Sequence, residues 1–299
     1  MGKRTMITGY IYVIASAVIF GCMPLMTKLI YAEGANPMSV VALRNAMALP
    51  VMALLVCGRG GSLRISMKQL PMLTLIGVLG CCITPWLLFA SYDYIFTGTA
   101  TVLHFVYPAL VVVGSAVFLK SKTSCWHIIS VAVCITGIAL FYTPGQMLRW
   151  QGVVLSLSSG LAFAVYVLLL STFRRGNMTG MTLTFYVVLV SAVSMFALCL
   201  ITGQMAFPTS LKGWLLCAIF AVTVSVGAVA LFQQGTLLIG GQRASILSTI
   251  EPITGIVIGV TIFQEDLTWR TVLGSCLVIL ASILIAISDA KKQKTICPD

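Results

Sequence analysis

The sequence predicts an all-α integral membrane protein of ten transmembrane helices, arranged as two inverted five-helix repeats around a central cavity. Composition is the first reason: 59% of the residues are hydrophobic and only 8% are charged, whereas soluble domains carry about 25% charged residues. The second reason is a series of apolar stretches that are long enough to cross a bilayer. The third is an internal duplication, of residues 1–146 and 147–299, whose two copies carry opposite charge at equivalent ends.

The apolar stretches follow one another along the whole chain. A helix needs about 20 mainly apolar residues to cross the hydrocarbon core of a bilayer. Glycine, proline and charged residues divide the chain into ten stretches of this kind, at residues 6–29, 38–57, 70–92, 98–119, 125–142, 151–173, 180–202, 211–238, 243–263 and 269–288. The first stretch is too long for the apolar core of a signal peptide and lacks a small-residue cleavage site, so we expect it to remain as a span.

Two segments of the chain resemble one another. Residues 97–108 read TGTATVLHFVYP and residues 241–252 read GQRASILSTIEP, which is a shift of 144 positions. The first copy continues to Lys120 and Lys122, and the second continues to Glu265 and Asp266. Lysine and arginine accumulate in cytoplasmic loops, whereas acidic residues have little effect on orientation. The two copies are therefore predicted to cross the membrane in opposite directions, as in alternating-access transporters.

The duplication extends beyond this segment to the first and sixth stretches. At a shift of 143 positions, three residues of the first stretch match three of the sixth, namely Gly9 with Gly152, Ser16 with Ser159 and Phe20 with Phe163. Each copy holds five stretches, and an odd number requires the second copy to enter the membrane from the other side. The turn-forming residues 143–146 mark the join between the copies.

The positive residues predict that both termini are cytoplasmic. With the N-terminus inside, thirteen of the 18 lysines and arginines fall in cytoplasmic connections, four fall outside and one, Arg44, lies within a span. The reverse orientation would oppose the positive-inside rule. The net charge of +11 is spread between apolar stretches instead of forming one basic face, so nucleic acid is not an expected partner. We expect a multi-pass protein of the cytoplasmic membrane, in contact with the lipid bilayer.

Residues 9–28, residues 37–44, Tyr107-Pro108 and Glu251-Pro252 together resemble the drug/metabolite transporter superfamily, specifically its EamA-type branch. The resemblance covers nearly the whole chain. It implies that spans one to four and six to nine surround a central substrate cavity, while spans five and ten pack peripherally. It also implies a small-molecule substrate among amino acids, other metabolites and drugs, commonly exported. The chain departs from the common pattern at His104 and at Asp93.

Ionisable residues inside the spans are the first candidates for contact with substrate or a coupling ion, because such groups are costly in a bilayer unless they face a cavity or a partner. Glu251 suits proton coupling or a substrate amine, and the alternative is a structural carboxylate beside Pro252. Arg44 suits a two-point contact with a substrate carboxylate. Its alternatives are snorkelling to the outer interface or a fixed pair with Glu251 or Asp93.

His104 lies well inside the fourth stretch. A histidine in this place suits proton relay or contact with a polar substrate. A hydrogen-bonded packing role is the more frequent one for a lone intramembrane histidine.

Prolines, aromatic residues and amides complete the predicted site. Pro108 and Pro252 occupy equivalent places in the two copies and predict a hinge or helix break, with a simple kink as the alternative. Asp93, at the external end of the third stretch, is a candidate gate. Further residues expected to line the cavity are Trp86, Tyr107, Tyr166, Gln233 and Gln234, although tryptophan and tyrosine also concentrate at membrane interfaces.

Several classes of function lack support in the sequence. No phosphate-binding loop is present, so direct drive by ATP is not expected. The ten cysteines form no metal-type cluster, and we expect neither a metal nor a cofactor. We therefore expect a secondary transporter and not an enzyme, most simply an exporter, with an uptake carrier or channel-like permease as the alternative and an intramembrane enzyme as a weaker one. Proton coupling is a hypothesis that rests on Glu251, and the sequence leaves the oligomeric state open.

Overall fold

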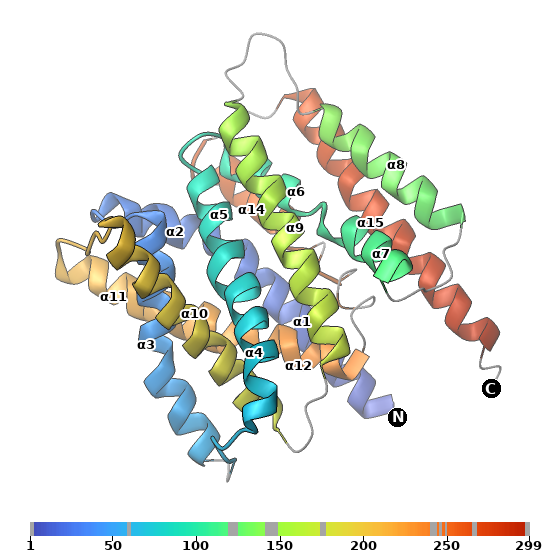
Figure 1. Cartoon of the computed structure of the whole chain (residues 1–299). Coiled ribbons are helices and arrows are strands. Elements are labelled where there is room, and N and C mark those ends of the chain that lie inside the picture. Colours follow the sequence, from blue (N-terminus) through green and yellow to red (C-terminus); the bar gives the residue numbers. More distant parts are fainter. Residues whose placement is uncertain are drawn as a thin grey trace.

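The computed structural model describes residues 3–58, 61–118, 125–140, 149–173, 178–239, 250–264 and 268–296, together with residues 244, 247 and 248. Every regular element within these ranges is a helix, which confirms the all-α class for the described part of the chain. The helices pack together as a bundle (Figure 1).

The helices in the first part of the chain are α1 (Lys3–Gly21), α2 (Met23–Ala32), α3 (Pro37–Gly58), η1 (Met67–Gln69), α4 (Leu70–Gly77), η2 (Val78–Ile83), α5 (Thr84–Ser91), α6 (Thr97–His104), α7 (Tyr107–Phe118) and α8 (Cys125–Leu140). Those in the second part are α9 (Trp150–Thr172), α10 (Gly180–Thr202), α11 (Leu211–Phe220), η3 (Ala221–Ala228), α12 (Val229–Ile239), α14 (Ile250–Thr261) and α15 (Trp269–Ile296).

Seven helical segments are long and apolar enough to cross a membrane, which identifies a multi-pass membrane protein. They are Met6–Ala32, Pro37–Gly58, Met67–Ser91, Thr97–Phe118, Trp150–Thr172, Gly180–Thr202 and Leu211–Ile239. These segments correspond to predicted stretches one to four and six to eight. Helix α8 has 16 residues, and α14 and the Val272–Ala281 part of α15 are shorter apolar helices. Spans five, nine and ten therefore stay predictions.

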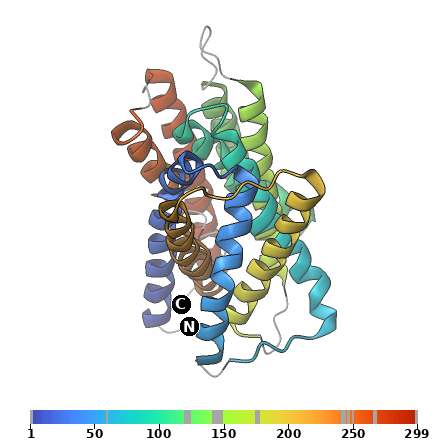
Figure 2. The same ribbon diagram turned by 90° about the vertical axis from the view of Figure 1, so that its left-hand side faces the viewer.

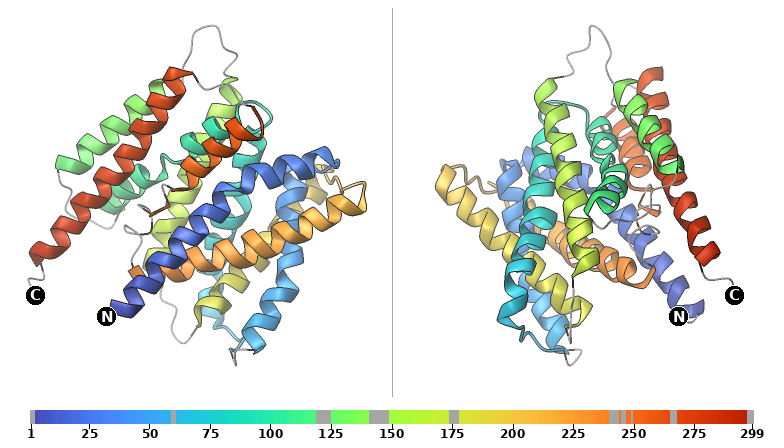
Figure 3. Two further views of the ribbon diagram at one scale, coloured as in Figure 1. Left: turned by 180° about the vertical axis from the view of Figure 1, so that it is seen from behind. Right: turned by 45° about the vertical axis from the view of Figure 1, so that its right-hand side comes forward.

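The peripheral helices and the chain ends have clear places in the bundle. Helices α8 and α15 lie side by side along one edge (Figures 1 and 3). The start of α1 and the end of α15 lie at the same end of the molecule (Figures 1 and 2). The connection between α3 and α4 reaches that end too, and its sequence includes Arg64 and Lys68. This arrangement agrees with two termini on one side of the membrane, and which side that is remains a prediction.

Two of the spans are broken next to a proline. Helices α1 and α2 are separated at Cys22, two residues before Pro24. Helices α6 and α7 are separated at residues 105–106, just before Pro108. Proline has no N–H to donate to the carbonyl four residues earlier, and this weakens the helix on its N-terminal side. Helix α14 begins at Ile250, close before the second predicted proline, Pro252.

Two other spans contain a π-helical segment, which the sequence analysis did not predict. The segments are η2 and η3, and their first residues, Val78 and Ala221, are 143 positions apart, the same shift as in the sequence duplication. In η2 the carbonyl of Leu79 accepts hydrogen bonds from both the backbone N–H and the hydroxyl of Thr84. Single π-helical turns inside α-helices often occur at functional sites.

Asn45 of α3 connects the two π-helical segments. Its Nδ2 donates to the carbonyl of Cys81 in η2 at 3.1 Å, and its Oδ1 accepts from Ser225 Oγ in η3 at 2.9 Å. The same Nδ2 donates to Ser191 Oγ of α10 at 2.7 Å. In a regular helix the carbonyl of Cys81 would accept from residue 85, but Pro85 has no N–H. Asn45 thus supplies a donor to a buried carbonyl whose α-helical donor is missing.

Hydrogen bonds between the two copies of the duplication occur in an equivalent pair. Ser16 Oγ of α1 donates to the carbonyl of Ala228 in η3 at 2.8 Å. Ser159 Oγ of α9 donates to the carbonyl of Thr84 in α5 at 2.8 Å. Ser16 and Ser159 are 143 positions apart, and Thr84 and Ala228 are 144 apart, so each serine joins its own copy to the equivalent place in the other.

Close packing follows the same relationship. A Cβ on Gly9 would lie 2.4 Å from Ile239 Cγ2, and a Cβ on Gly152 would lie 2.9 Å from Ile95 Cγ2. Both pairs are related by the same shift of 143 or 144 positions. Glycine at these two places permits a close approach that any side chain would prevent.

Candidate functional site

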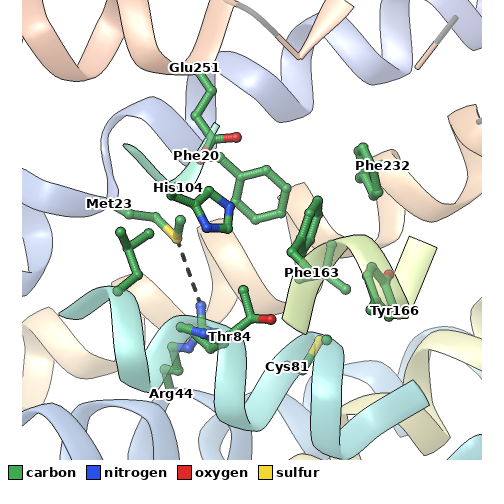
Figure 4. A pocket seen from close by; sticks show the side chains of 14 residues that line it. Phe20, Met23, Arg44, Cys81, Thr84, His104, Phe163, Tyr166, Phe232 and Glu251 are labelled. Carbon is green, nitrogen blue, oxygen red and sulfur yellow. Dashed lines mark hydrogen bonds between the residues drawn. The ribbon is translucent and has the colours of Figure 1, made fainter. Parts of the chain in front are cut away.

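Interrupted and continuous spans together surround a cavity, shown in Figure 4. It contains about 540 Å³ of space free of protein atoms, open solvent included. The lining residues come from spans one to four, six and eight and from α14, namely Phe20, Met23, Arg44, Gly80, Cys81, Thr84, Pro85, Leu88, His104, Phe163, Tyr166, Val229, Phe232 and Glu251.

Arg44 is buried in the wall of this cavity, with 3% of its surface exposed. Its guanidinium carbon lies 5.6 Å from the ring centroids of both Phe89 and Phe220, and aromatic faces stabilise a cation. Nη1 lies 4.0 Å from Met23 Sδ, and Nε has no hydrogen-bond partner. The stacking therefore holds the charge in place while leaving donors of the guanidinium available to a ligand.

Neither structural alternative predicted for Arg44 is present. Its burial is incompatible with snorkelling to a membrane interface. The ion pair found in the described part of the chain is between Lys212 and Glu33, and Arg44 is paired there with neither Glu251 nor Asp93.

Glu251 lies in the first turn of α14 and is 7% exposed. Its carboxylate lines the cavity, and no hydrogen bond to it comes from the described residues. The sequence analysis gave one structural alternative, in which backbone groups beside Pro252 hold the carboxylate. The described residues do not form such a contact. Tyr107, its equivalent in the first copy, lies close to Glu251 and Ser248. A cation and a carboxylate thus line the same cavity without pairing with one another.

His104, the last residue of α6, lies in the wall between two aromatic rings. Its ring centroid is 5.4 Å from that of Phe163 and 5.6 Å from that of Tyr107. Nδ1 lies 2.9 Å from Ser159 Oγ. The ring is therefore both fixed by packing and hydrogen bonding and open to the cavity.

Aromatic rings form an apolar part of the wall. The ring centroids of Phe163 and Phe232 are 5.8 Å apart, those of Phe163 and Tyr166 are 5.2 Å apart, and those of Phe20 and Phe232 are 6.3 Å apart. In Figure 4 the rings of Phe163, Tyr166 and Phe232 lie on one side, and Arg44 lies on another. The cavity can therefore accept a molecule that has both apolar and charged parts.

Four residues that the sequence predicted to line the cavity are not among its lining residues. Gln233 is fully buried, accepts from Thr184 Oγ1 and donates to Tyr166 Oη at 3.2 Å, so it supports a lining residue from behind. Gln234 Nε2 contacts Met181 Sδ, and Trp86 packs in an apolar cluster. The ring of Tyr107 packs against that of His104. Neighbouring helical residues point about 100° apart, so Pro85 lines the cavity and Trp86 does not.

Asp93, the predicted gate, is exposed on the turn between α5 and α6 and lies near Lys28. A different contact joins elements at this end of the molecule. Glu33, just after α2, accepts hydrogen bonds from Ser210 Oγ at 2.5 Å and Lys212 Nζ at 3.1 Å. These bonds lower the pKa of the Glu33 carboxyl below its usual value, Ser210 contributing most. The α2–α3 connection is thereby tied to the start of α11.

Sequence reasoning missed several lining residues, above all Phe20, Met23, Cys81, Thr84 and Phe232. For one of them a signal existed. Phe20 and Phe163 are equivalent in the duplication, and both line the cavity. Repeated aromatic residues could therefore have been taken as cavity candidates.

Known proteins resemble this chain in both halves. The sequence profile of the EamA-like transporter family matches residues 7–143 and again residues 150–287. An uncharacterized transporter of Archaeoglobus fulgidus is 23% identical over 263 residues, covering 84% of this chain and 88% of the relative. An uncharacterized transporter of Clostridium kluyveri is 21% identical over 295 residues, covering 95% and 94%. The uncharacterized transporter YcbK of Bacillus subtilis is 25% identical over 284 residues, covering 91% and 90%.

A solved crystal structure shares the fold. It superimposes with a TM-score of 0.66 over 96% of this chain and 99% of that chain. The two sequences are 16% identical, so the likeness concerns the fold alone.

Proposed function

The chain belongs to the EamA-like transporter family of the drug/metabolite transporter superfamily and is a multi-pass membrane transporter, and we propose that it moves small organic metabolites across the cytoplasmic membrane by alternating access. The substrate class comprises amino acids, related compounds or drugs, and the direction is export. The observation that carries the proposal is the cavity in which Arg44 and Glu251 are buried without pairing. Buried charges without partners are costly, and a bound substrate or proton would supply what they lack.

Alternating access in this proposal uses two inverted repeats, residues 1–146 and 147–299. The equivalent bonds of Ser16 and Ser159 support this division, as do the π-helical segments at equivalent places. Each repeat contacts the other through the third span, which carries the π-helical segment in both. Rocking of one repeat against the other would open the cavity to each side in turn.

Roles follow for the predicted residues. Arg44 holds a substrate carboxylate, and Glu251 holds a substrate amine or the coupling proton, with His104 and Tyr166 as further contacts. Gln233 positions Tyr166. The helix break before Pro108 acts as a hinge, and so does the start of α14 at Pro252. Asp93 acts at the outer gate together with the Glu33 contact. Both termini are cytoplasmic in this arrangement.

The test begins with a thermal-shift screen of the purified protein against amino acids and other small metabolites, because a molecule that binds the folded state raises its unfolding temperature. Metabolites that bind are then loaded into liposomes carrying the protein, and their efflux is measured. Efflux that depends on the protein and saturates with concentration is expected. Flux that rises linearly without saturation would indicate a channel-like pore, and the absence of flux for every binding metabolite would count against transport.

A further inference from the structure

We infer that Ser159 is a positioning residue for substrate recognition, holding His104 with its proton on Nδ1 so that Nε2 faces the cavity as an acceptor for an amine N–H of the substrate. This inference rests on the proposed function of the cavity. It names a second amine contact besides Glu251 and a residue, outside the cavity lining, that controls it.

The hydroxyl proton of Ser159 determines where the proton of His104 lies. A serine hydroxyl has one proton to donate. Ser159 Oγ lies 2.8 Å from the carbonyl oxygen of Thr84, which can only accept, so the proton is directed there. The second contact of Ser159 Oγ, at 2.9 Å to His104 Nδ1, then requires Nδ1 to be the donor. The hydroxyl of Thr84 does not donate to Ser159 Oγ, because it donates to the carbonyl of Leu79.

Nε2 is the nitrogen that remains for a ligand. His104 lines the cavity, and no hydrogen bond to Nε2 comes from the residues that the structure describes. The ring is held between Phe163 and Tyr107, which opposes a flip that would exchange the two nitrogens. In a neutral imidazole with its proton on Nδ1, Nε2 carries a lone pair and accepts a hydrogen bond.

The acceptors define the chemical class of the ligand. Nε2 of His104 and the carboxylate of Glu251 line the same cavity, and Figure 4 draws the histidine ring between Glu251 and Arg44. A primary ammonium group has three N–H donors and can bond to both acceptors at once. A quaternary ammonium group has the same charge but no N–H. A higher affinity for the primary ammonium than for the quaternary one therefore measures hydrogen bonding separately from charge.

The chain provides a matched control in Ser16. Ser16 Oγ donates an equivalent hydrogen bond, also at 2.8 Å, to the carbonyl of Ala228. The position equivalent to His104 is Ser248, 144 positions later. Ser16→Ala therefore removes a bond of the same kind between the same two parts of the chain and leaves the histidine contact intact.

The first experiment observes the histidine directly. The chain has two histidines, His104 and His127, so His127→Gln leaves one ring signal in protein labelled with ¹⁵N-histidine. At neutral pH in detergent micelles, we expect the ¹⁵N shifts of a neutral ring protonated at Nδ1, in this parent and with Ser16→Ala. With Ser159→Ala, we expect a shift of population toward the form protonated at Nε2. An imidazolium or an Nε2–H ring in the parent, or the same response to both serine variants, would overturn the inference.

The second experiment uses two probes, 2-phenylethylamine and its N,N,N-trimethyl analogue, with affinity measured by calorimetry. We expect the parent and Ser16→Ala to prefer the primary amine by about tenfold, as for a hydrogen bond to a charged group, and Ser159→Ala to lose most of this preference. Steric exclusion of the larger probe would instead persist in Ser159→Ala. Equal binding of both probes to the parent, or binding of neither, would overturn the amine contact. An intact preference without any transport would contradict only the proposed function.

Discussion

Ser16 and Ser159, 143 positions apart in the chain, make the same hydrogen bond at 2.8 Å, each to a carbonyl in the third span of the other copy. Both serines are fully buried. The acceptor carbonyls lie at the end of η3 and directly after η2, where the helical hydrogen bonding is irregular. The two bonds thus join the copies at the places where each third span departs from the α-helix.

Loss of either bond should destabilise the protein by a similar amount. For Ser16→Ala we expect a loss of about 1 kcal/mol, because a buried carbonyl loses its donor. Ser159→Ala should cost about as much or more, since it leaves His104 Nδ1 without its partner as well. Thermal unfolding of the two variants in detergent would measure both. An unchanged unfolding temperature for Ser16→Ala would show that the bond between the copies contributes nothing to stability.

Gly160 should not tolerate a side chain. A Cβ there would lie 2.5 Å from the backbone oxygen of His104 and 2.8 Å from Val106 Cγ1. Because backbone yields less readily than a flexible side chain, Gly160→Ala should cost about 1–3 kcal/mol and weaken ligand binding by displacing His104. Gly58→Ala is the control, since no atom from another described part of the chain lies within 4 Å of a Cβ added there. Similar unfolding temperatures for the two variants would contradict the close contact.

Arg44→Lys should separate charge from geometry. Lysine keeps the charge but loses the planar fork and its stacking on Phe89 and Phe220. We expect affinity for carboxylated substrates to fall about tenfold or more, while neutral analogues bind as before. Arg270→Lys is the control, because Arg270 lies over Trp269 at 5.4 Å but does not line the cavity. Equal losses for carboxylated and neutral ligands would indicate a structural role for Arg44.

Glu251→Gln should uncouple transport from the proton gradient. The side chain keeps its size and loses the ability to carry a proton in and out, and it is the carboxylate that lines the cavity. In liposomes, flux through the parent should respond to an imposed pH gradient and flux through the variant should not. Glu33→Gln, which alters a carboxylate at the connection after α2, should leave the response intact. A gradient response that survives in Glu251→Gln would exclude coupling through this residue.

The contact of Glu33 should weaken in acid. Hydrogen bonds from Ser210 and Lys212 lower the pKa of Glu33 in the folded protein. A carboxyl with a lowered pKa stabilises the fold above its unfolded value, of about 4.3, and this contribution disappears as the pH falls through the folded value. The parent should therefore unfold at a higher temperature than Glu33→Gln at pH values above roughly 5, and the difference should shrink on acidification. A difference that is constant with pH would show that the charge of Glu33 is irrelevant.

Much of the fold was accessible from the sequence because hydropathy and charge act along the chain. The seven spans found in the described part all start or end within a few residues of the predicted stretches. The break before Pro108 was predictable too, since a missing N–H is a local property. The π-helical segments were not, because η2 is supported by Asn45, 36 positions before Cys81 in the chain.

The cavity was predictable in part. Arg44, His104, Tyr166 and Glu251 line it as expected, because ionisable and amphipathic residues inside a span are rarely placed against lipid. Gln233, Gln234 and Trp86 do not line it, because the rotation of a helix about its axis depends on which neighbours it packs against. The polar and aromatic character of these side chains suggested a site. The direction in which each side chain points could not be inferred from that character.

The sequence by itself determined that this protein is helical, spans a membrane several times and contains a duplication, since composition, span length and internal similarity are properties of the chain alone. The tertiary structure decided which charges meet in the cavity, that Arg44 and Glu251 remain unpaired within the described part, and that Ser159 holds His104. These features depend on contacts between distant segments, such as Ser159 with Thr84 and Asn45 with Ser225, 75 and 180 positions apart. Such contacts form only when whole helices pack, and no local property of the chain encodes them.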